Sequence, residues 1–478
     1  MSSFKTNIIF GAIWSIIGQF GYVGVVLVTN IILSRILSPY IFGQIGIVMF
    51  FIILFNVLVE GGMGGALIRK KEATNLDYTT VFLFNLVIST VIFLILVLFS
   101  GVIAHYYKDI ALKNILIVSG LLLIINSFQL VHNIKLTREL QFKKKAFYSL
   151  ISIVFSSSIG VCMAYYGFGV WSMVIIQLLN AALIAILLWT FEGNFGPLLF
   201  SKDSFRELIK FGANTTVALM INTAFENIYQ LVLGRYFSIN QVGLFYQAKR
   251  LMDMPTALVA GTGSSVIYAS ISKLQDDRER FIYTFNKILF TYAVAIGLVT
   301  TMVFVYAENI ILILYGNKWI GATYYMKLLC IVTFFFSINV INELIFKVFD
   351  QTKRILHIMI IRNSIQAITI IVGVWMLNLD VLIYGFVFTT LISFLFYFYF
   401  SRKILNSYST IEMFNLLKIV AIAISIIVSV SFLANTMHLK GMITFIFVPF
   451  IILIYIFGIQ YLKILDLFGE IQSLLKKR

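Results

Sequence analysis

The residues of this sequence that could do chemistry are ionisable side chains set within or beside long apolar runs. The nine that we select as candidates are Arg35, Glu60, Glu226, Arg235, Lys249, Arg250, Asp253, Glu343 and Arg362. An ionisable group near the centre of a bilayer costs about 2.5–3.5 kcal/mol on insertion scales, so it normally faces a cavity or a partner. We therefore expect these side chains to line a polar cavity that could bind a ligand.

Two of the candidates, Arg250 and Glu226, have no evident partner nearby in the sequence. We expect both to face the cavity. Glu226 is also a candidate for reversible binding of a proton or a sodium ion, and a hydrogen-bonded structural glutamate is the alternative explanation.

Structural pairing explains others of these charges equally well. Lys249 and Asp253 are four residues apart, which is the spacing of an ion pair on one face of a helix. Glu343 and Arg362 fall at similar depth in consecutive apolar runs. A salt bridge between them is at least as good an explanation as a role in ligand binding.

No catalytic or metal-binding constellation is evident in the sequence. The four histidines are scattered, and the two cysteines lie in separate apolar runs without metal-binding spacing. The glycine-rich stretch 61–65 resembles a phosphate loop only superficially, because no strand precedes it and no Lys-Ser/Thr pair follows. We expect these glycines to let helices pack closely. The sequence therefore predicts a protein that is not an enzyme and has no cofactor or metal.

The elements that must position the charges are about 14 apolar runs, each long enough to cross roughly 30 Å of hydrocarbon as a helix. Of the 478 residues 60% are hydrophobic and only 12% are charged, too few to cover a soluble protein of this size. The predicted spans are 8–33, 41–67, 79–104, 112–133, 146–166, 168–190, 206–234, 242–272, 280–306, 321–350, 355–378, 381–401, 412–435 and 441–463. Pro255, followed by the stretch 261–263, predicts a bend in the eighth span.

Lys and Arg crowd into every second gap between these runs. Such clustering marks the cytoplasmic side of a multi-pass inner-membrane protein, and it places both termini in the cytoplasm. The net charge of +16 belongs to these short gaps. It forms no basic stripe on a polar domain, so we expect no nucleic-acid partner.

An internal repeat joins the two halves of the chain. Residues 35–43 (RILSPYIFG) recur as residues 235–243 (RYFSINQVG), each copy connecting an odd span to the next one. Six spans separate the copies, so the halves should have parallel topology. We expect an all-α membrane protein with two six-helix lobes and two extra C-terminal helices. The expected domains are residues 1–200, 201–405 and 406–478.

Three stretches resemble a known family. Residues 29–43 (TNIILSRILSPYIFG) resemble the span 1–2 signature of the polysaccharide transporter (Wzx-type) flippases, in the superfamily that also holds MATE drug exporters. Residues 138–143 (RELQFK) are similar to a cytoplasmic motif of its colanic-acid and teichuronic-acid branch, and residues 314–319 (LYGNKW) also fit.

This resemblance implies a MATE-like fold of 14 helices that carries an undecaprenyl-diphosphate-linked oligosaccharide from the cytoplasmic to the periplasmic leaflet. The glycan would serve O-antigen, capsule or exopolysaccharide synthesis. Membrane lipids, a polysaccharide polymerase and a chain-length regulator are the implied partners. The family's cavities are cationic, and Arg35, Arg235 and Arg250 match that character by position. Proton or sodium coupling is compatible with the resemblance.

Two other functions remain open. A cation-coupled drug exporter on the same fold often relies on a buried acid in the first lobe, where Glu60 is the available candidate. A membrane polymerase or glycosyltransferase usually carries a long outer loop with catalytic acids. The longest outer segment here, residues 306–321, is short, largely apolar and without an acid pair.

Overall fold

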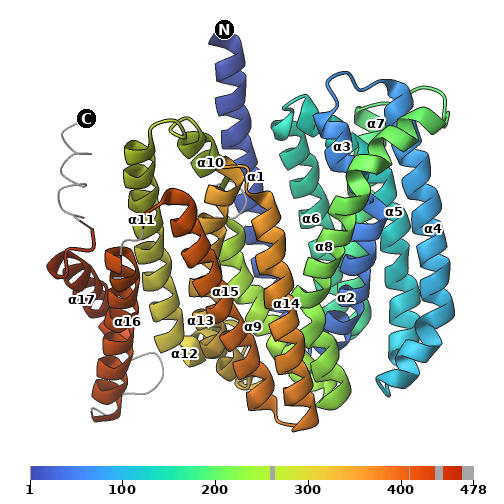
Figure 1. Cartoon of the computed structure of the whole chain (residues 1–478). Helices are drawn as coiled ribbons and strands as arrows, with labels where there is room; N and C mark the ends of the chain where they lie inside the picture. The colour runs from blue at the N-terminus through green and yellow to red at the C-terminus, as the bar shows by residue number, and fades with distance from the viewer. Residues whose placement is uncertain (1, 259–263, 408–409, 437–444, 466–478) are drawn as a thin grey trace. The chain divides into compact units, whose positions relative to one another are not determined.

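The computed structural model describes residues 2–258, 264–407, 410–436 and 445–465, where all its regular elements are helices joined by turns and loops (Figure 1). Contacts between Cα atoms divide the chain into two compact units, Met1–Tyr246 and Gln247–Arg478. The helix α9 (Ile239–Leu258) carries the chain from the first unit into the second.

Unit 1 is built from eight helices and the start of α9. They are α1 (Ser2–Ile36), α2 (Pro39–Glu60), α3 (Met63–Arg69), α4 (Asn75–Tyr106), α5 (Ala111–Arg138), α6 (Phe142–Tyr165), α7 (Val170–Phe191) and α8 (Lys202–Tyr236). Helix α4 starts at a capping box in which Thr74 and Asp77 satisfy each other's backbone groups. Pro39 is the first residue of α2, where its missing N–H costs nothing.

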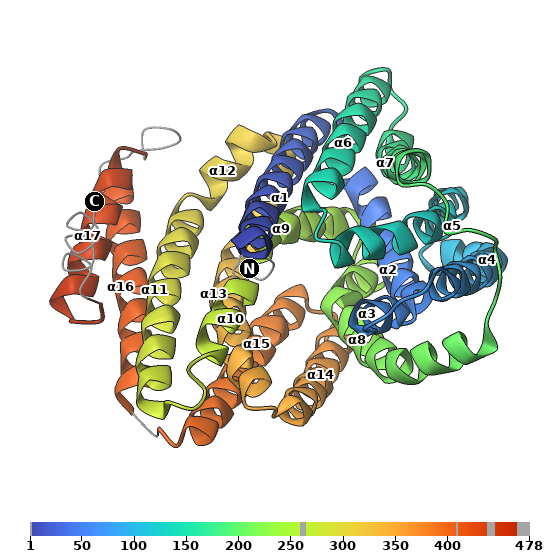
Figure 2. The ribbon, with the colours of Figure 1, turned by 90° about the horizontal axis from the view of Figure 1, so that it is seen from above.

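Unit 2 continues with helices of similar length, with the shorter helices α10, α12 and α17, and with one 3-10 turn. They are α10 (Ser264–Ser272), α11 (Arg278–Val305), α12 (Ala307–Leu314), the 3-10 turn η2 (Asn317–Trp319), α13 (Ala322–Val348), α14 (Thr352–Trp375), α15 (Leu379–Leu405), α16 (Thr410–Thr436) and α17 (Val448–Tyr461). Seen from above, α16 and α17 lie beside α11 (Figure 2). The hydrophobic core of unit 2 joins α11, α13, α15, α16 and α17.

The expected all-α membrane fold is confirmed, since each predicted span, where the structure describes it, falls on one helix or on two consecutive helices. Within the described residues, 11 helices are long and apolar enough to cross a bilayer, and α17 is a shorter apolar helix. Helices α8 and α9 have the length but not the apolar composition. They carry Glu226, Lys249, Arg250 and Asp253 together with several amides, so polar side chains lower their hydropathy.

Two predicted spans are divided in the structure. The span predicted at 41–67 is α2 followed by α3, because Gly61 and Gly62 adopt the left-handed region with φ of 53° and 62°. The span predicted at 242–272 comprises α9 and α10. Pro255 lies in α9, whereas the stretch 261–263, on which the predicted bend also depends, lies outside the described residues.

The two copies of the repeat contact each other reciprocally within unit 1. A Cβ atom added to Gly43 would lie 1.9 Å from the backbone oxygen of Ile239, and one added to Gly243 would lie 1.8 Å from the backbone oxygen of Pro39. Positions 39 and 43 are the repeat equivalents of 239 and 243, so each copy presents the same surface to the other. Such a self-complementary contact is expected of two elements related by a two-fold axis.

The glycines between α2 and α3 also allow a close approach, as the sequence predicts. A Cβ atom on Gly62 would lie 2.5 Å from the backbone oxygen of Gly212 in α8, and one on Gly212 would lie 2.4 Å from that of Gly61. The stretch is therefore a helix-packing site in which backbones touch.

Candidate functional site

A polar cavity of about 210 Å³ lies between the end of α2 and the second half of α5, within unit 1. Its polar lining side chains are Asn56, Glu60, Asn126, Ser127, Gln129 and Asn133. Glu60 is exposed and terminates α2. Of the nine candidate charges, this cavity therefore contains one, and it surrounds that one with amides.

A second cavity, of about 230 Å³, lies between α1 and α6 and contains a lysine. Lys145 is half-buried there beside Gln19, Tyr22 and Ser149. Its ammonium group makes a long hydrogen bond of 3.4 Å to Thr137 Oγ1, and no carboxylate within the described chain pairs with it. The cavity thus presents a positive charge. The sequence analysis did not select Lys145 as a candidate.

The two repeated arginines end α1 and α8. Arg35 is exposed in the last turn of α1. Arg235 donates a hydrogen bond of 2.8 Å to the backbone oxygen of Tyr106, and its guanidinium lies 4.4 Å from the centre of the Tyr106 ring. The contact ties α8 to the end of α4, so Arg235 has a packing role within unit 1.

The charges of α9 lie at the beginning of unit 2. Lys249 Nζ is 2.8 Å from Asp253 Oδ2, so the expected intrahelical ion pair is present. Arg250 is half-buried on the same helix. Glu226, on α8 in unit 1, is exposed and accepts a hydrogen bond of 2.7 Å from Asn222, one turn earlier. The assignment of Arg250 and Glu226 to a transport cavity stays a prediction.

Glu343 forms an ion pair that the sequence analysis did not consider. Its Oε1 atom is 2.9 Å from Lys347 Nζ, one turn further along α13. Arg362 on α14 is half-buried and donates to the side-chain oxygen of Asn363. The i,i+4 spacing of Glu343 and Lys347 was available in the sequence and would have predicted this pair.

A buried ion pair in unit 2 was missed entirely. Arg402 on α15 and Glu412 on α16 are 4% and 7% exposed, and their Nε and Oε2 atoms are 2.8 Å apart. The two atoms are not aligned as a hydrogen bond. Asn286 on α11 accepts from Arg402 Nη1 at 3.0 Å and donates to the other carboxylate oxygen of Glu412. These three side chains join three helices.

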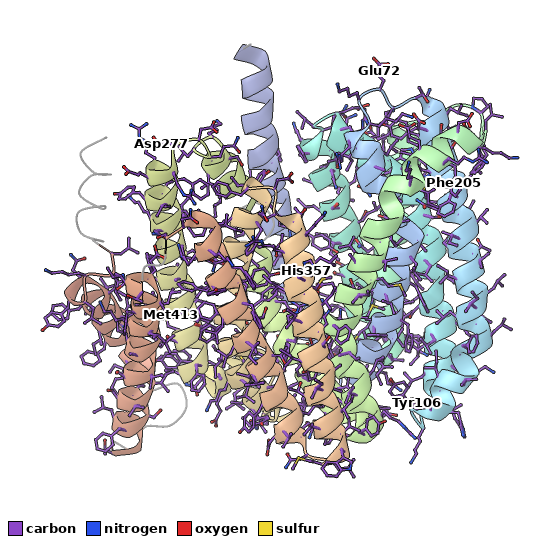
Figure 3. All side chains as sticks on the ribbon, viewed as in Figure 1. Glu72, Tyr106, Phe205, Asp277, His357 and Met413 are labelled. Carbon is purple, nitrogen blue, oxygen red and sulfur yellow. The ribbon has the colours of Figure 1, made fainter. Side chains whose placement is uncertain are left out.

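The ends of several helices in unit 1 are joined by a second charged network. Lys70 Nζ lies 2.9 Å from both Asp77 and Glu207. The hydrogen bond to Glu207 raises the pKa of Lys70; burial opposes that rise, and the bond to Asp77 adds to it. Arg138 donates to the backbone oxygens of Leu67 and Lys70, just where α3 ends. Figure 3 marks this end of unit 1 with Glu72 and the opposite end with Tyr106.

These contacts explain two of the sequence motifs. The arginine of residues 138–143 satisfies carbonyl groups that the end of α3 leaves unpaired. In residues 314–319, Trp319 is fully buried and its ring centre lies 5.9 Å from that of Tyr315. Both motifs therefore hold the fold together.

An apolar cavity of about 420 Å³ lies in unit 2 between α11, α13 and α16. Gly297, Thr300, Cys330, Phe334 and Ile424 are among its lining residues. Among the described residues, no group of three or more His, Cys, Asp or Glu side chains could hold a metal ion.

Long apolar helices with polar cavities and charges among them define a multi-pass membrane protein. The sequence profile of the family described as "Polysaccharide biosynthesis protein" matches residues 32–324. The chain belongs to this family, and the expectation that it is not an enzyme is confirmed.

Curated relatives support the assignment. The chain is 24% identical over 332 residues to the lipopolysaccharide biosynthesis protein WzxC of Escherichia coli (strain K12), a match that covers 69% of this chain and 68% of the relative. It is 26% identical over 310 residues to the succinoglycan biosynthesis transport protein ExoT of Rhizobium meliloti (strain 1021), covering 64% of this chain and 62% of the relative.

Solved structures share the fold. A lipid II flippase MurJ in an inward closed conformation superposes with a TM-score of 0.73 at 16% identity, over 96% of this chain and 98% of that one. An inward-facing multidrug transporter of the MATE family superposes with a TM-score of 0.60 at 14% identity, over 82% of this chain and 96% of that one. The expected MATE-like fold is thereby confirmed.

Proposed function

We propose that this transporter moves an undecaprenyl-diphosphate-linked oligosaccharide from the cytoplasmic to the periplasmic leaflet of a bacterial inner membrane. The glycan would be a unit of O-antigen, capsule or exopolysaccharide. Both termini would lie in the cytoplasm, as the distribution of Lys and Arg favours. A polysaccharide polymerase and a chain-length regulator would use the product.

One observation carries the choice of substrate class. The superposition on the lipid II flippase covers nearly all of both chains, whereas that on the multidrug transporter covers only 82% of this chain. The curated relatives agree, since their names place them in lipopolysaccharide and succinoglycan biosynthesis.

The physical chemistry of the substrate fits the polar sites. A sugar–diphosphate head group cannot cross hydrocarbon unaided, because its charges and hydroxyls would lose their water. Half-buried cations such as Arg250 and Lys145 can compensate the phosphate charges. A membrane potential that is negative inside favours outward movement of an anion by about 2.3 kcal/mol per charge per 100 mV, so ATP is not needed.

Alternating access is the mechanism that we propose for this movement. The moving parts would be the two six-helix lobes, residues 1–200 and 201–405, with residues 406–478 appended. Glu226, which accepts from Asn222, would exchange a proton or a sodium ion as the lobes move.

Deletion of the gene in its own bacterium tests the proposal. We expect loss of a surface polysaccharide and accumulation of the lipid-linked oligosaccharide, with both defects reversed by the intact gene. Unchanged polymer and no accumulated intermediate would contradict the proposed function.

A cation-coupled multidrug exporter is the second candidate. The superposition on the multidrug transporter and the acid Glu60 in a polar cavity of unit 1 favour it. It predicts that the deletion strain becomes sensitive to toxic cations while its surface polymer stays normal. The flippase proposal predicts that the deletion strain loses its surface polymer while its sensitivity to toxic cations stays normal.

A further inference from the structure

The cavity between α2 and α5 is a preformed set of hydrogen-bonding groups. Asn126 Nδ2 donates to Asn56 Oδ1 at 3.2 Å, and Gln129 Nε2 donates to Asn126 Oδ1 at 2.8 Å. These two bonds fix the planes of three amides and leave the Asn56 NH₂ group and the Gln129 carbonyl free to bind something else. The side chains of Glu60 and Asn133 form no hydrogen bond or ion pair with any residue that the structure describes.

The wall behind these groups is rigid. Val59 is 2% exposed and packs with Ile92 and Leu123 in a small apolar cluster. A tightly packed wall cannot collapse to fill the cavity. The donors and acceptors therefore stay open to a ligand.

Glu60 gives the cavity a negative charge. It is the last residue of α2, so its carboxylate stands at the negative end of the helix dipole. Among the described residues that line the cavity, none is a Lys or Arg that could compensate this charge. Groups that donate hydrogen bonds, such as hydroxyls or an ammonium, would stabilise the carboxylate, whereas a second anion would be repelled.

The lining selects the kind of ligand. Amides and a carboxylate together can both donate to and accept from neighbouring hydroxyls, which is what a sugar ring offers. The volume of about 210 Å³ suits a single pyranose ring. Because no cation lines the cavity, the diphosphate of a lipid-linked sugar has no counter-charge there.

We infer that this cavity binds one sugar ring of the transported glycan and selects neutral or amino sugars over acidic ones. The inference rests on the proposed function. Glu60 determines the selectivity by its charge, and Asn56, Gln129 and Asn133 supply the hydrogen bonds. A pocket that discriminates by repulsion as well as attraction is a common source of specificity.

The test compares two probes that differ at one carbon atom. Farnesyl diphosphate linked to glucose and farnesyl diphosphate linked to glucuronic acid are titrated against the full-length protein in lipid nanodiscs. We expect the glucose probe to bind at least about tenfold more tightly, because a like-charge contact opposes the acid. Glu60→Gln should bring the two affinities together.

Matched variants separate this selectivity from general damage. Glu72→Gln removes the same charge from the exposed loop between α3 and α4, labelled in Figure 3, and should leave the ratio of affinities unchanged. Asn133→Ala should lower the affinity for both probes by roughly 2–10-fold, the effect of one lost hydrogen bond, and should leave the ratio of the two affinities unchanged. Each variant is compared with wild type by its unfolding midpoint.

Failure of the inference can be told from failure of the proposed function. If wild type binds both sugar probes equally, or Glu60→Gln keeps the ratio, the selectivity assigned to this cavity is wrong while the flippase proposal stands. If neither probe binds more tightly than farnesyl diphosphate without a sugar, both are wrong.

Discussion

Arg402 and Glu412 form a buried ion pair, in which each charge compensates the other where water is excluded. The pair is nearly enclosed, and Asn286 bonds to both partners. Removing one partner leaves the other as a buried charge without compensation, which is more damaging than removing the pair. The three side chains thereby fasten α16 to α11 and α15.

We expect Arg402→Ala to lower the free energy of unfolding by about 3–5 kcal/mol, the cost of breaking a buried ion pair. Thermal unfolding of the purified protein in detergent measures this. Arg280→Ala is the control, because the Arg280–Asp277 pair is 79% and 51% exposed and such a pair contributes at most about 1 kcal/mol. Equal effects of the two substitutions would show that the buried pair has no special role.

Arg250 is the candidate that we expect to matter most for transport. Arg250→Ala should reduce surface polysaccharide roughly 10–100-fold, the loss expected for a hydrogen bond to a charged group, while the protein stays inserted in the membrane. Arg250→Lys keeps the charge and should retain part of the activity. Polymer is quantified in a deletion strain that expresses each variant. Normal polymer with Arg250→Ala would remove this residue from the mechanism.

Charge pairs were predictable from the sequence only where spacing fixes them. Lys249 and Asp253 lie one helical turn apart, so their ion pair followed from helix geometry. The pair of Arg402 and Glu412 joins two helices, and its third member, Asn286, comes from a distant helix. No local rule brings such residues together.

At the level of helices, the repeat of residues 35–43 and 235–243 is a packing device. The starts of α2 and α9 cross where Gly43 and Gly243 bring one backbone against the other. Close approach through glycine is how helices associate where the surrounding lipid offers no hydrophobic drive. The sequence analysis recognised the repeat but did not foresee that its copies touch.

We expect Gly43→Ala and Gly243→Ala each to destabilise the protein by about 1–3 kcal/mol, because the added methyl group has no room. Gly101→Ala in α4 meets nothing within 4 Å and serves as the control. The double variant at 43 and 243 should lose less free energy of unfolding than the sum of the two single losses, since both substitutions act on one contact. Wild-type unfolding midpoints for Gly43→Ala and Gly243→Ala would contradict the packing.

The length of the apolar runs predicted which segments form helices. It did not predict where one run is divided into two helices. The run at 41–67 is continuously apolar, so only the left-handed conformations of Gly61 and Gly62, set by the contact with Gly212, reveal where α2 ends. The segment 306–321 likewise folds into α12 and η2, because the side chains of Trp319 and Tyr315 are buried against their neighbours.

On the scale of the whole molecule, the class of protein followed from the pattern of apolar runs and three motifs. The family match and the superposition on a lipid II flippase agree with that prediction. The cavities did not follow from the pattern, because Glu60 and the amides of α5 are far apart in the sequence and meet only when α2 packs on α5. The sugar selectivity that we infer would depend on this packing of α2 on α5.

The most direct measurement follows the glycan itself across a membrane. The full-length protein is reconstituted into vesicles that carry a lipid-linked oligosaccharide in the inner leaflet, and exposure of the glycan to an impermeant glycosidase outside is timed. We expect exposure many times faster than in protein-free vesicles, and slowed by Arg250→Ala. Exposure at the protein-free rate, under either sign of membrane potential and with proton and sodium gradients imposed, would contradict the account.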